Sequence, residues 1–176
     1  MKIGIPLEIK PREQRVALLP AAVAELVSLG HEVFVQSGAG RGSGYEDAAY
    51  TVAGAIVVSD AESLYGEAQL VVKVKEPMPA EYPLLREDHL LFSYLHLAAY
   101  PELTARLQQI GLTALAFETL LVDNNLPLLA PMSDVAGRLA VQIGTTLLYA
   151  TPVSYTHLRA HETRYTISYG VFCLER

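Results

Sequence analysis

The sequence predicts an α/β fold in which a mostly parallel sheet is covered by helices on both faces. Short runs rich in β-forming residues recur along the chain, and segments with a helical period lie between several of them. The β-rich runs are continuously apolar instead of alternating, which is expected when both faces of a strand are buried. These observations together favour a doubly wound sheet, of the Rossmann-like or flavodoxin-like type.

Six strands are expected from the β-rich runs, each ending where polar or turn-forming residues begin. They cover residues 2–8, 32–36, 55–58, 69–75, 90–96 and 112–118.

Three helices are expected between and after these strands. The first begins at Leu19-Pro20, because proline suits the first helical position, and it stops at Gly30. Its apolar face is formed by Val23, Leu26, Val27 and Leu29. The second runs from Pro101 to Gly111 by the same signals, and the third begins near Ser133 and continues to residue 150.

The chain is expected to divide into three parts. Residues 1–132 form the α/β domain, and residues 133–150 begin a helix that connects it to a further domain. Residues 151–176 show no clear period over their first half, and VSYTHLRAHET resembles translated sequencing-adaptor read-through. We therefore expect residues 151–176 to be a non-native tail, and we give their histidines and Cys173 no functional weight.

Composition narrows the possible partners. The net charge of −6 and the lack of a Lys/Arg cluster predict no nucleic-acid partner. The single cysteine and the absence of paired Cys/His spacing predict no metal site. The apolar runs are too short to span a bilayer, and the first ten residues do not read as a signal peptide. A cytoplasmic protein with no membrane partner is expected.

Four ionisable residues follow four different predicted strands. Arg15 lies in the loop after the first strand, Lys75 closes the fourth, His96 the fifth and Glu118 the sixth. Ligands of open parallel sheets bind outside the carboxyl ends of the strands, so these side chains outline a cleft. An arginine can hold a carboxylate by two parallel hydrogen bonds, a lysine can polarise a carbonyl oxygen, and a histidine can transfer protons near neutral pH.

Ordinary interpretations compete with this one at each position. An arginine within KPREQR is more often a solvated surface residue, and a histidine after an aromatic strand is more often a satisfied core or rim residue. A lysine at a strand end usually turns to water, and Lys73, on the same strand face as Lys75, is interpreted as ordinary in this way.

The glycine-rich stretch SGAGRGSG at residues 37–44 does not match a dinucleotide fingerprint. The pattern G-x-G-x-x-G would need glycine where Ser43 or Tyr45 stands. A sharply turning loop after a strand explains these glycines instead.

Several segments resemble the N-terminal part of the alanine dehydrogenase family, whose domain also occurs in proton-translocating nicotinamide nucleotide transhydrogenases. The segments are MKIGIPLEIKPREQRVALLPAAVAELVSLGHEV, SGAGRGSGYED, VVKVKEP, LLFSYLHLAA, LAFETL and LPLLAPMSDVAGRLAVQIG. They extend over residues 1 to about 150, and SYLHLAA, FETL and LLAPMSDVAGRLA favour alanine dehydrogenase over transhydrogenase.

The resemblance implies a set of site residues. By it, Arg15 and Lys75 bind the substrate, His96 is the catalytic residue that transfers protons, and Ser133 approaches the phosphates or ribose of the cofactor. Further residues implied to line or support the pocket are Tyr94, Glu118 and Met132. The implied reaction is the reversible, NAD-dependent oxidative deamination of L-alanine to pyruvate and ammonia.

The resemblance also implies parts that this chain lacks. In the family the main NAD-binding domain follows the connecting helix, and later helices complete the first domain. We therefore expect the 176-residue chain alone to be inactive and poorly soluble. Family members form homo-oligomers, commonly hexamers. Two alternatives remain open: a transhydrogenase subunit, and a non-catalytic module that binds small carboxylates.

Overall fold

The computed structural model describes residues 1–150, so the tail predicted at residues 151–176 lies outside the described residues. Contacts divide the chain into two compact units, Met1–Leu121 and the segment from Val122 onward. The functional division proposed at residue 132 stays a prediction.

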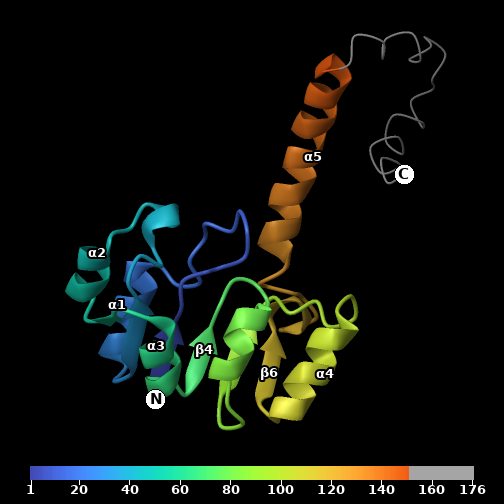
Figure 1. The fold of residues 1–176 in the computed structure, drawn as a ribbon. Coiled ribbons are helices and arrows are strands. Elements are labelled where there is room, and N and C mark those ends of the chain that lie inside the picture. Colours follow the sequence, from blue (N-terminus) through green and yellow to red (C-terminus); the bar gives the residue numbers. More distant parts are fainter. Residues whose placement is uncertain (151–176) are drawn as a thin grey trace, which may run out of the picture. The chain divides into compact units, whose positions relative to one another are not determined.

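The first unit contains a six-stranded sheet in which every strand pair is parallel (Figure 1). The strands are β1 (Lys2–Ile5), β2 (Glu32–Gln36), β3 (Ile56–Val58), β4 (Leu70–Val72), β5 (Leu90–Ser93) and β6 (Thr113–Ala116). Their order is β3-β2-β1-β4-β5-β6, so the chain builds outward from β1 in one direction and then from β4 in the other. This is the doubly wound order, and the predicted fold class is confirmed.

Four α-helices connect the strands of this unit. They are α1 (Pro20–Ser28), α2 (Asp47–Val52), α3 (Ala61–Glu67) and α4 (Pro101–Ile110). Both predicted helices, α1 and α4, begin with proline, and Gly111 closes α4 with a left-handed φ of 82°. The shorter α2 and α3 were not predicted, because six or seven residues give too little length to show a helical period. Three short 3₁₀ segments also occur: η1 (Arg41–Ser43), η2 (Pro79–Leu84) and η3 (Phe117–Thr119).

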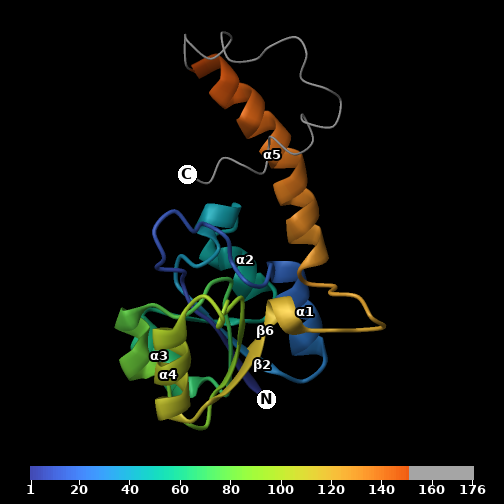
Figure 2. The same ribbon diagram turned by 90° about the vertical axis from the view of Figure 1, so that its right-hand side faces the viewer.

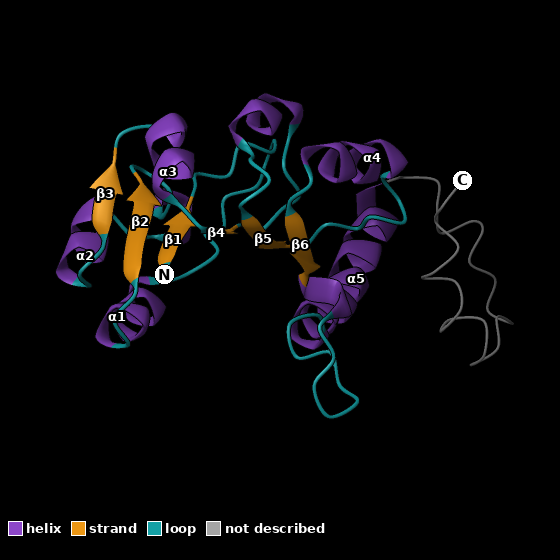
Figure 3. Cartoon of the chain, turned by 90° about the horizontal axis from the view of Figure 1, so that it is seen from below, coloured by secondary structure: helices purple, strands orange, loops and turns teal. Residues whose placement is uncertain are grey.

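Helices cover the sheet from both sides, and Figure 3 shows α1 and α2 on one face and α3 and α4 on the other. Alternate residues of β2 supply the two cores: Val33 and Val35 pack with α1 and α2, whereas Phe34 packs with α3 and α4. The continuously apolar strands thus pack against helices on both faces of the sheet, as the sequence predicted.

Four strands are shorter than their apolar runs suggested. β1, β4, β5 and β6 end at Ile5, Val72, Ser93 and Ala116, while the predicted strands extended to residues 8, 75, 96 and 118. Regular pairing stops at these ends, although the Lys73 N–H still donates to Phe92 O and the Tyr94 N–H to Val74 O, and polar side chains follow at the edge of the sheet. The shortening therefore falls where the candidate site residues lie.

The second unit contains helix α5 (Ala130–Ala150), the predicted connecting helix. It begins at Ala130 and not near Ser133, because Pro131 fits the first turn and the Ser133 N–H donates to Leu129 O at 3.0 Å. Ser133 consequently lies inside the helix and is not its cap. Among the described residues, no helix is both long and apolar enough to cross a membrane.

Candidate functional site at the carboxyl edge of the sheet

The strand order reverses between β1 and β4, and the loops that follow these two strands diverge to opposite sides of the sheet. Such a switch point leaves a crevice at the carboxyl edge, where ligands of doubly wound sheets bind. The loop after β1 carries Arg15, and the segment after β4 carries Lys75.

Arg15 is paired with a carboxylate from its own loop. Its Nε donates to Oε1 of Glu13 at 2.8 Å, and its Nη2 lies 2.6 Å from Oε2. The hydrogen bonds from Arg15 lower the pKa of Glu13 to about 2. The Arg15 side chain is 42% exposed, so the guanidinium is fixed in orientation while remaining open to solvent.

The glycine-rich stretch supports this loop from the side. A Cβ at Gly42 would lie 2.3 Å from the carbonyl oxygen of Gln14, so only glycine allows the two backbones this close. Ser43 Oγ accepts a hydrogen bond from the Val16 N–H at 3.2 Å. Figure 2 shows the loop after β1, in dark blue, beside this stretch, in cyan. Gly38 and Gly44 have left-handed φ values of 81° and 85°, which confirms a turning loop.

Lys75 is half-buried, and its backbone is held by an acidic side chain from the β1 loop. Oε1 of Glu8 accepts hydrogen bonds from the Val74 N–H at 2.6 Å and from the Lys75 N–H at 3.3 Å. The charge of Lys75 also contributes to lowering the pKa of Glu13, which places the lysine in the same electrostatic environment as the Arg15 pair.

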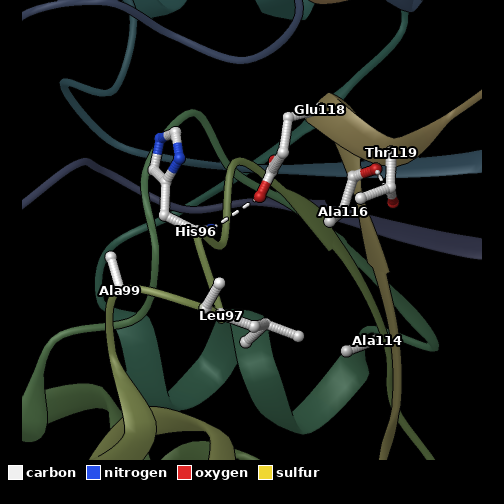
Figure 4. A pocket seen from close by; sticks show the side chains of 8 residues that line it. His96, Leu97, Ala99, Ala114, Ala116, Glu118 and Thr119 are labelled. Atoms are coloured by element: carbon white, nitrogen blue, oxygen red, sulfur yellow. Dashed lines mark hydrogen bonds between the residues drawn. The ribbon is translucent and has the colours of Figure 1, made fainter.

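His96 lies at a second carboxylate contact, between β5 and β6. Oε1 of Glu118 accepts from the His96 N–H at 2.6 Å (Figure 4). Its Oε2 accepts from the Leu95 N–H at 3.3 Å. His96 has a φ of 48°, in the left-handed region that side chains rarely adopt. A pocket of about 400 Å³ opens beside it, lined by His96, Leu97, Ala98, Ala99, Ala114, Ala116, Glu118 and Thr119.

Tyr94 connects the His96 side of this edge to the Arg15 side. Its ring stacks on the His96 imidazole with centroids 6.1 Å apart and planes inclined by 11°. Burial raises the pKa of Tyr94, the Arg15 guanidinium opposes that rise, and Glu118 adds to it. The structure thus brings Arg15, Lys75, Tyr94, His96 and Glu118 to one edge, although of these five only His96 and Glu118 line the 400 Å³ pocket.

Two predicted site residues lie in the other unit. Met132 and Ser133 belong to the first turns of α5, and both are exposed there. Their assignments to the substrate pocket and to the cofactor stay predictions.

Sequence reasoning missed four acidic or basic residues that shape this edge: Glu8, Glu13, Lys73 and Glu81. The interpretation of Lys73 as an ordinary solvent-facing lysine is wrong, because its side chain is fully buried. The position of Lys73 directly after a continuously apolar strand was the available sign that this lysine is buried. Its carboxylate partners come from other segments, so the sequence alone could not name them.

A larger hollow of about 680 Å³ lies next to the 400 Å³ pocket, and Ala99 lines both. Its walls include Lys10, Glu76, Met78, Tyr82 and Tyr100, and none of the predicted site residues lines it. Within residues 1–150, no group of three or more His, Cys, Asp or Glu side chains is arranged to hold a metal ion.

The strand order and the polar residues at the switch point define a Rossmann-like α/β domain. Residues 4–136 match the family model described as "Alanine dehydrogenase/PNT, N-terminal domain". The chain belongs to this family.

Curated relatives support the same assignment. The chain is 53% identical over 148 residues to alanine dehydrogenase of Bacillus subtilis, covering 84% of this chain and 39% of the relative. It is 51% identical over 152 residues to alanine dehydrogenase of Mycobacterium tuberculosis, covering 86% and 41%. The chain thus spans about two fifths of the length of these relatives.

Solved structures agree in fold. An L-alanine dehydrogenase superimposes with a TM-score of 0.80 at 54% identity, covering 84% of this chain and 41% of the other. A transhydrogenase from Sinorhizobium meliloti superimposes with a TM-score of 0.63 at 31% identity, covering 67% and 34%.

Proposed function

We propose that this chain is the substrate-binding and proton-transferring part of an alanine dehydrogenase. The reaction is the reversible, NAD-dependent conversion of L-alanine to pyruvate and ammonia. The observation that carries the proposal is the 53% identity to an alanine dehydrogenase over 148 residues. Identity to the transhydrogenase is 31%, which favours the dehydrogenase over the transhydrogenase alternative.

Arg15 and Lys75 are assigned to the substrate. The guanidinium binds the carboxylate of alanine or pyruvate, and the Lys75 ammonium binds the neighbouring carbonyl oxygen. Glu13 fixes the plane of the guanidinium through two hydrogen bonds, so Arg15 is held in one orientation. A preoriented donor loses less rotamer entropy when a ligand binds.

His96 is assigned to proton transfer at the carbon that carries the amine or carbonyl group. Its side chain is exposed at the pocket, and an imidazole can both donate and accept a proton through its two ring nitrogens. The ring stacks on Tyr94, and Glu118 holds the backbone from which the ring extends by accepting from the Leu95 and His96 N–H groups. Tyr94 and Glu118 are therefore assigned as supporting residues, and Met132 as a further pocket residue.

The described residues do not fit the pyrophosphate of NAD at the switch point. The turn after β1 reads Pro6-Leu7-Glu8 where a dinucleotide site needs glycines, and the Glu8 carboxylate already takes the nearby N–H groups. We therefore assign the main NAD site to sequence outside this chain, with Ser133 as the contact from α5. The chain alone is expected to form no NADH from L-alanine, and measurable NADH formation would contradict this assignment.

The remaining expectations belong to the complete enzyme. Homo-oligomers, with hexamers as the expected form, and a cytoplasmic location are proposed from the family resemblance. A non-catalytic carboxylate-binding module is the alternative of a different class. Sequencing the gene beyond residue 150 separates the two, because the enzyme requires a glycine-rich strand-turn-helix there and the module requires a stop codon.

The site assignment is tested by calorimetric titration of pyruvate and L-alanine into the 176-residue chain. Arg15→Ala is expected to weaken pyruvate binding at least 10-fold, since a charge-assisted bidentate contact contributes about 1.5–3 kcal/mol. Arg41→Ala is the matched control, because Arg41 also pairs with a glutamate, Glu46, on an exposed loop. Equal binding by wild type and Arg15→Ala would contradict the role of Arg15.

A further inference from the structure

We propose that Glu8 is a positioning residue for Lys75, and that the buried Lys73 is the internal counter-ion that holds the Glu8 carboxylate in place. The inference rests on the proposed function for the role of Lys75. The arrangement of the three residues is a separate structural observation.

The two oxygens of Glu8 have different partners. Oε1 accepts from the Val74 N–H at 2.6 Å and from the Lys75 N–H at 3.3 Å, while Oε2 lies 3.4 Å from Lys73 Nζ. The Glu8 side chain is 4% exposed, so water competes little for these contacts. One carboxylate from the β1 loop therefore fixes the backbone at which the Lys75 side chain begins.

Lys73 makes this contact stable by holding two carboxylates at once. Its Nζ also donates to Oε1 of Glu81 at 2.6 Å, and the Lys73 side chain is fully buried. Burial raises the pKa of Glu8, and the charge of Lys73 opposes that rise. Without Lys73, two carboxylates would remain buried with no cation between them.

Glu81 and Glu8 share Lys73 but hold different parts of the domain. Glu81 accepts from the Tyr65 hydroxyl at 2.8 Å and from the Met78 N–H at 2.8 Å, which joins η2 to α3. Glu8 alone of the two accepts from the Lys75 N–H. Removing either carboxylate disturbs the same buried ion network, and only the removal of Glu8 releases the backbone of Lys75.

This difference distinguishes the positioning of Lys75 by Glu8 from the general stabilisation of the domain by both carboxylates. A displacement of about 1 Å at a ligand-binding group is enough to cost a large factor in binding or rate. Glu8 is far from Lys75 in the sequence but adjacent in space, because β1 and β4 pair directly across the switch point. Glu8 therefore sets the place of the lysine relative to the Arg15 loop, which begins on the same segment.

The experiment compares three variants of the 176-residue chain with the wild type. Glu8→Ala removes the acceptor, Glu8→Gln keeps an acceptor oxygen but removes the charge, and Glu81→Ala is the matched control. Three quantities are measured: pyruvate affinity by calorimetry, Tm, and amide hydrogen exchange at Val74 and Lys75 by NMR.

Glu8→Ala is expected to weaken pyruvate binding at least 10-fold and to accelerate exchange at both amides at least 10-fold. Glu8→Gln is expected to restore affinity to within about 3-fold of the wild type, because its amide oxygen still accepts from Val74. Glu81→Ala is expected to lower Tm as much as Glu8→Ala, with pyruvate affinity within about 3-fold of the wild type.

Two results would overturn the proposal. One is a loss of affinity in Glu81→Ala equal to that in Glu8→Ala, which would make the network merely structural. The other is unchanged exchange at Lys75 in Glu8→Ala. If Glu8→Ala does not fold, Glu8→Asp replaces it, because a shortened carboxylate keeps the charge beside Lys73 but withdraws from the two N–H groups.

Failure of the proposed function gives a different pattern. If the wild-type chain binds no pyruvate, the assignment of Arg15 and Lys75 to a carboxylate fails. The exchange data then still decide the positioning role: acceleration at Lys75 in Glu8→Ala but not in Glu81→Ala supports it, and equal exchange rates refute it.

Discussion

At the ends of two neighbouring strand pairs, a glutamate carboxylate bridges the two segments, and the two bridges differ in how deeply they are buried. In the Glu8 bridge, a carboxylate after β1 accepts from the Val74 and Lys75 N–H groups after β4. In the Glu118 bridge, a carboxylate after β6 accepts from the Leu95 and His96 N–H groups after β5. In each case the second N–H belongs to a residue with a proposed role in substrate chemistry.

The difference lies in the surroundings of the two carboxylates. Glu8 is buried against a cation, and the backbone that it holds is ordinary, whereas Glu118 is half-buried at a pocket and holds His96 at a φ of 48°. A buried bridge contributes rigidity through electrostatics, and a bridge at a pocket stabilises an unfavourable backbone conformation. The same hydrogen-bond pattern therefore predicts different responses to substitution.

The largest expected effect is at the counter-ion of the Glu8 bridge. Lys73→Met leaves Glu8 and Glu81 buried without their shared cation, and it is expected to lower the free energy of unfolding by about 3–5 kcal/mol. Urea denaturation of the 176-residue chain measures this. Lys75→Met, two residues away, is the control and is expected to change stability by less than about 1 kcal/mol. Equal losses would remove the distinction between the two lysines.

A smaller effect is expected at the Glu118 bridge. Glu118→Ala removes the carboxylate that accepts from two N–H groups, and water can take the place of this acceptor because the site is half-buried. The free energy of unfolding is therefore expected to fall by about 1–3 kcal/mol. Urea denaturation again gives the value, and amide exchange at His96 should accelerate. A loss as large as that of Lys73→Met would show that the two bridges are energetically alike.

The strained residue in the Glu118 bridge provides the third comparison. His96→Gly is expected to raise the free energy of unfolding by up to about 1 kcal/mol, because glycine adopts a left-handed φ without the cost of a Cβ. Lys75→Gly, at an ordinary φ in the other bridge, is expected to destabilise the chain. Thermal unfolding distinguishes the signs, and destabilisation by both would argue against strain at His96.

The smallest expected effect is a pH dependence confined to the Glu8 bridge. Burial raises the pKa of Glu8 above its ordinary value of 4.5, so the folded chain binds this proton more readily than the unfolded chain. The stability of wild type relative to Glu8→Gln should therefore increase as pH falls from 7 toward 4.5. Denaturation of both proteins at several pH values tests the slope, and a relative stability that decreases on acidification would contradict it.

Much of the fold could be predicted from local patterns. Proline at the first helical position located α1 and α4, and apolar runs located all six strands. The strand ends were placed two or three residues too late at β1, β4, β5 and β6, since buried apolar residues such as Val74 and Leu95 continue beyond the ends of the regular strands. Hydrophobicity reports burial, and it does not report where strand pairing stops.

The candidate site could be predicted only in part. Arg15, Lys75, His96 and Glu118 were found because each follows a strand, and parallel topology brings strand ends together. Glu8 and Glu13 also follow β1, but nothing local showed that one would bind the backbone after β4 and the other a neighbouring guanidinium. The partner of Glu8 depends on the strand order, in which β4 and not β3 lies beside β1.

The pairing of Glu13 with Arg15 has a consequence for the kinetics of ligand capture. The charges of Glu13 and Arg15 sum to zero at this edge of the sheet, so an approaching anion would meet a dipole beside Lys75 instead of two unpaired cations. Long-range attraction is weak under these conditions, and the association rate of a small carboxylate is expected to vary little with ionic strength. The choice among small carboxylate ligands then depends on the direction of short hydrogen bonds formed after contact. Ligands are therefore distinguished by their shape more than by their charge.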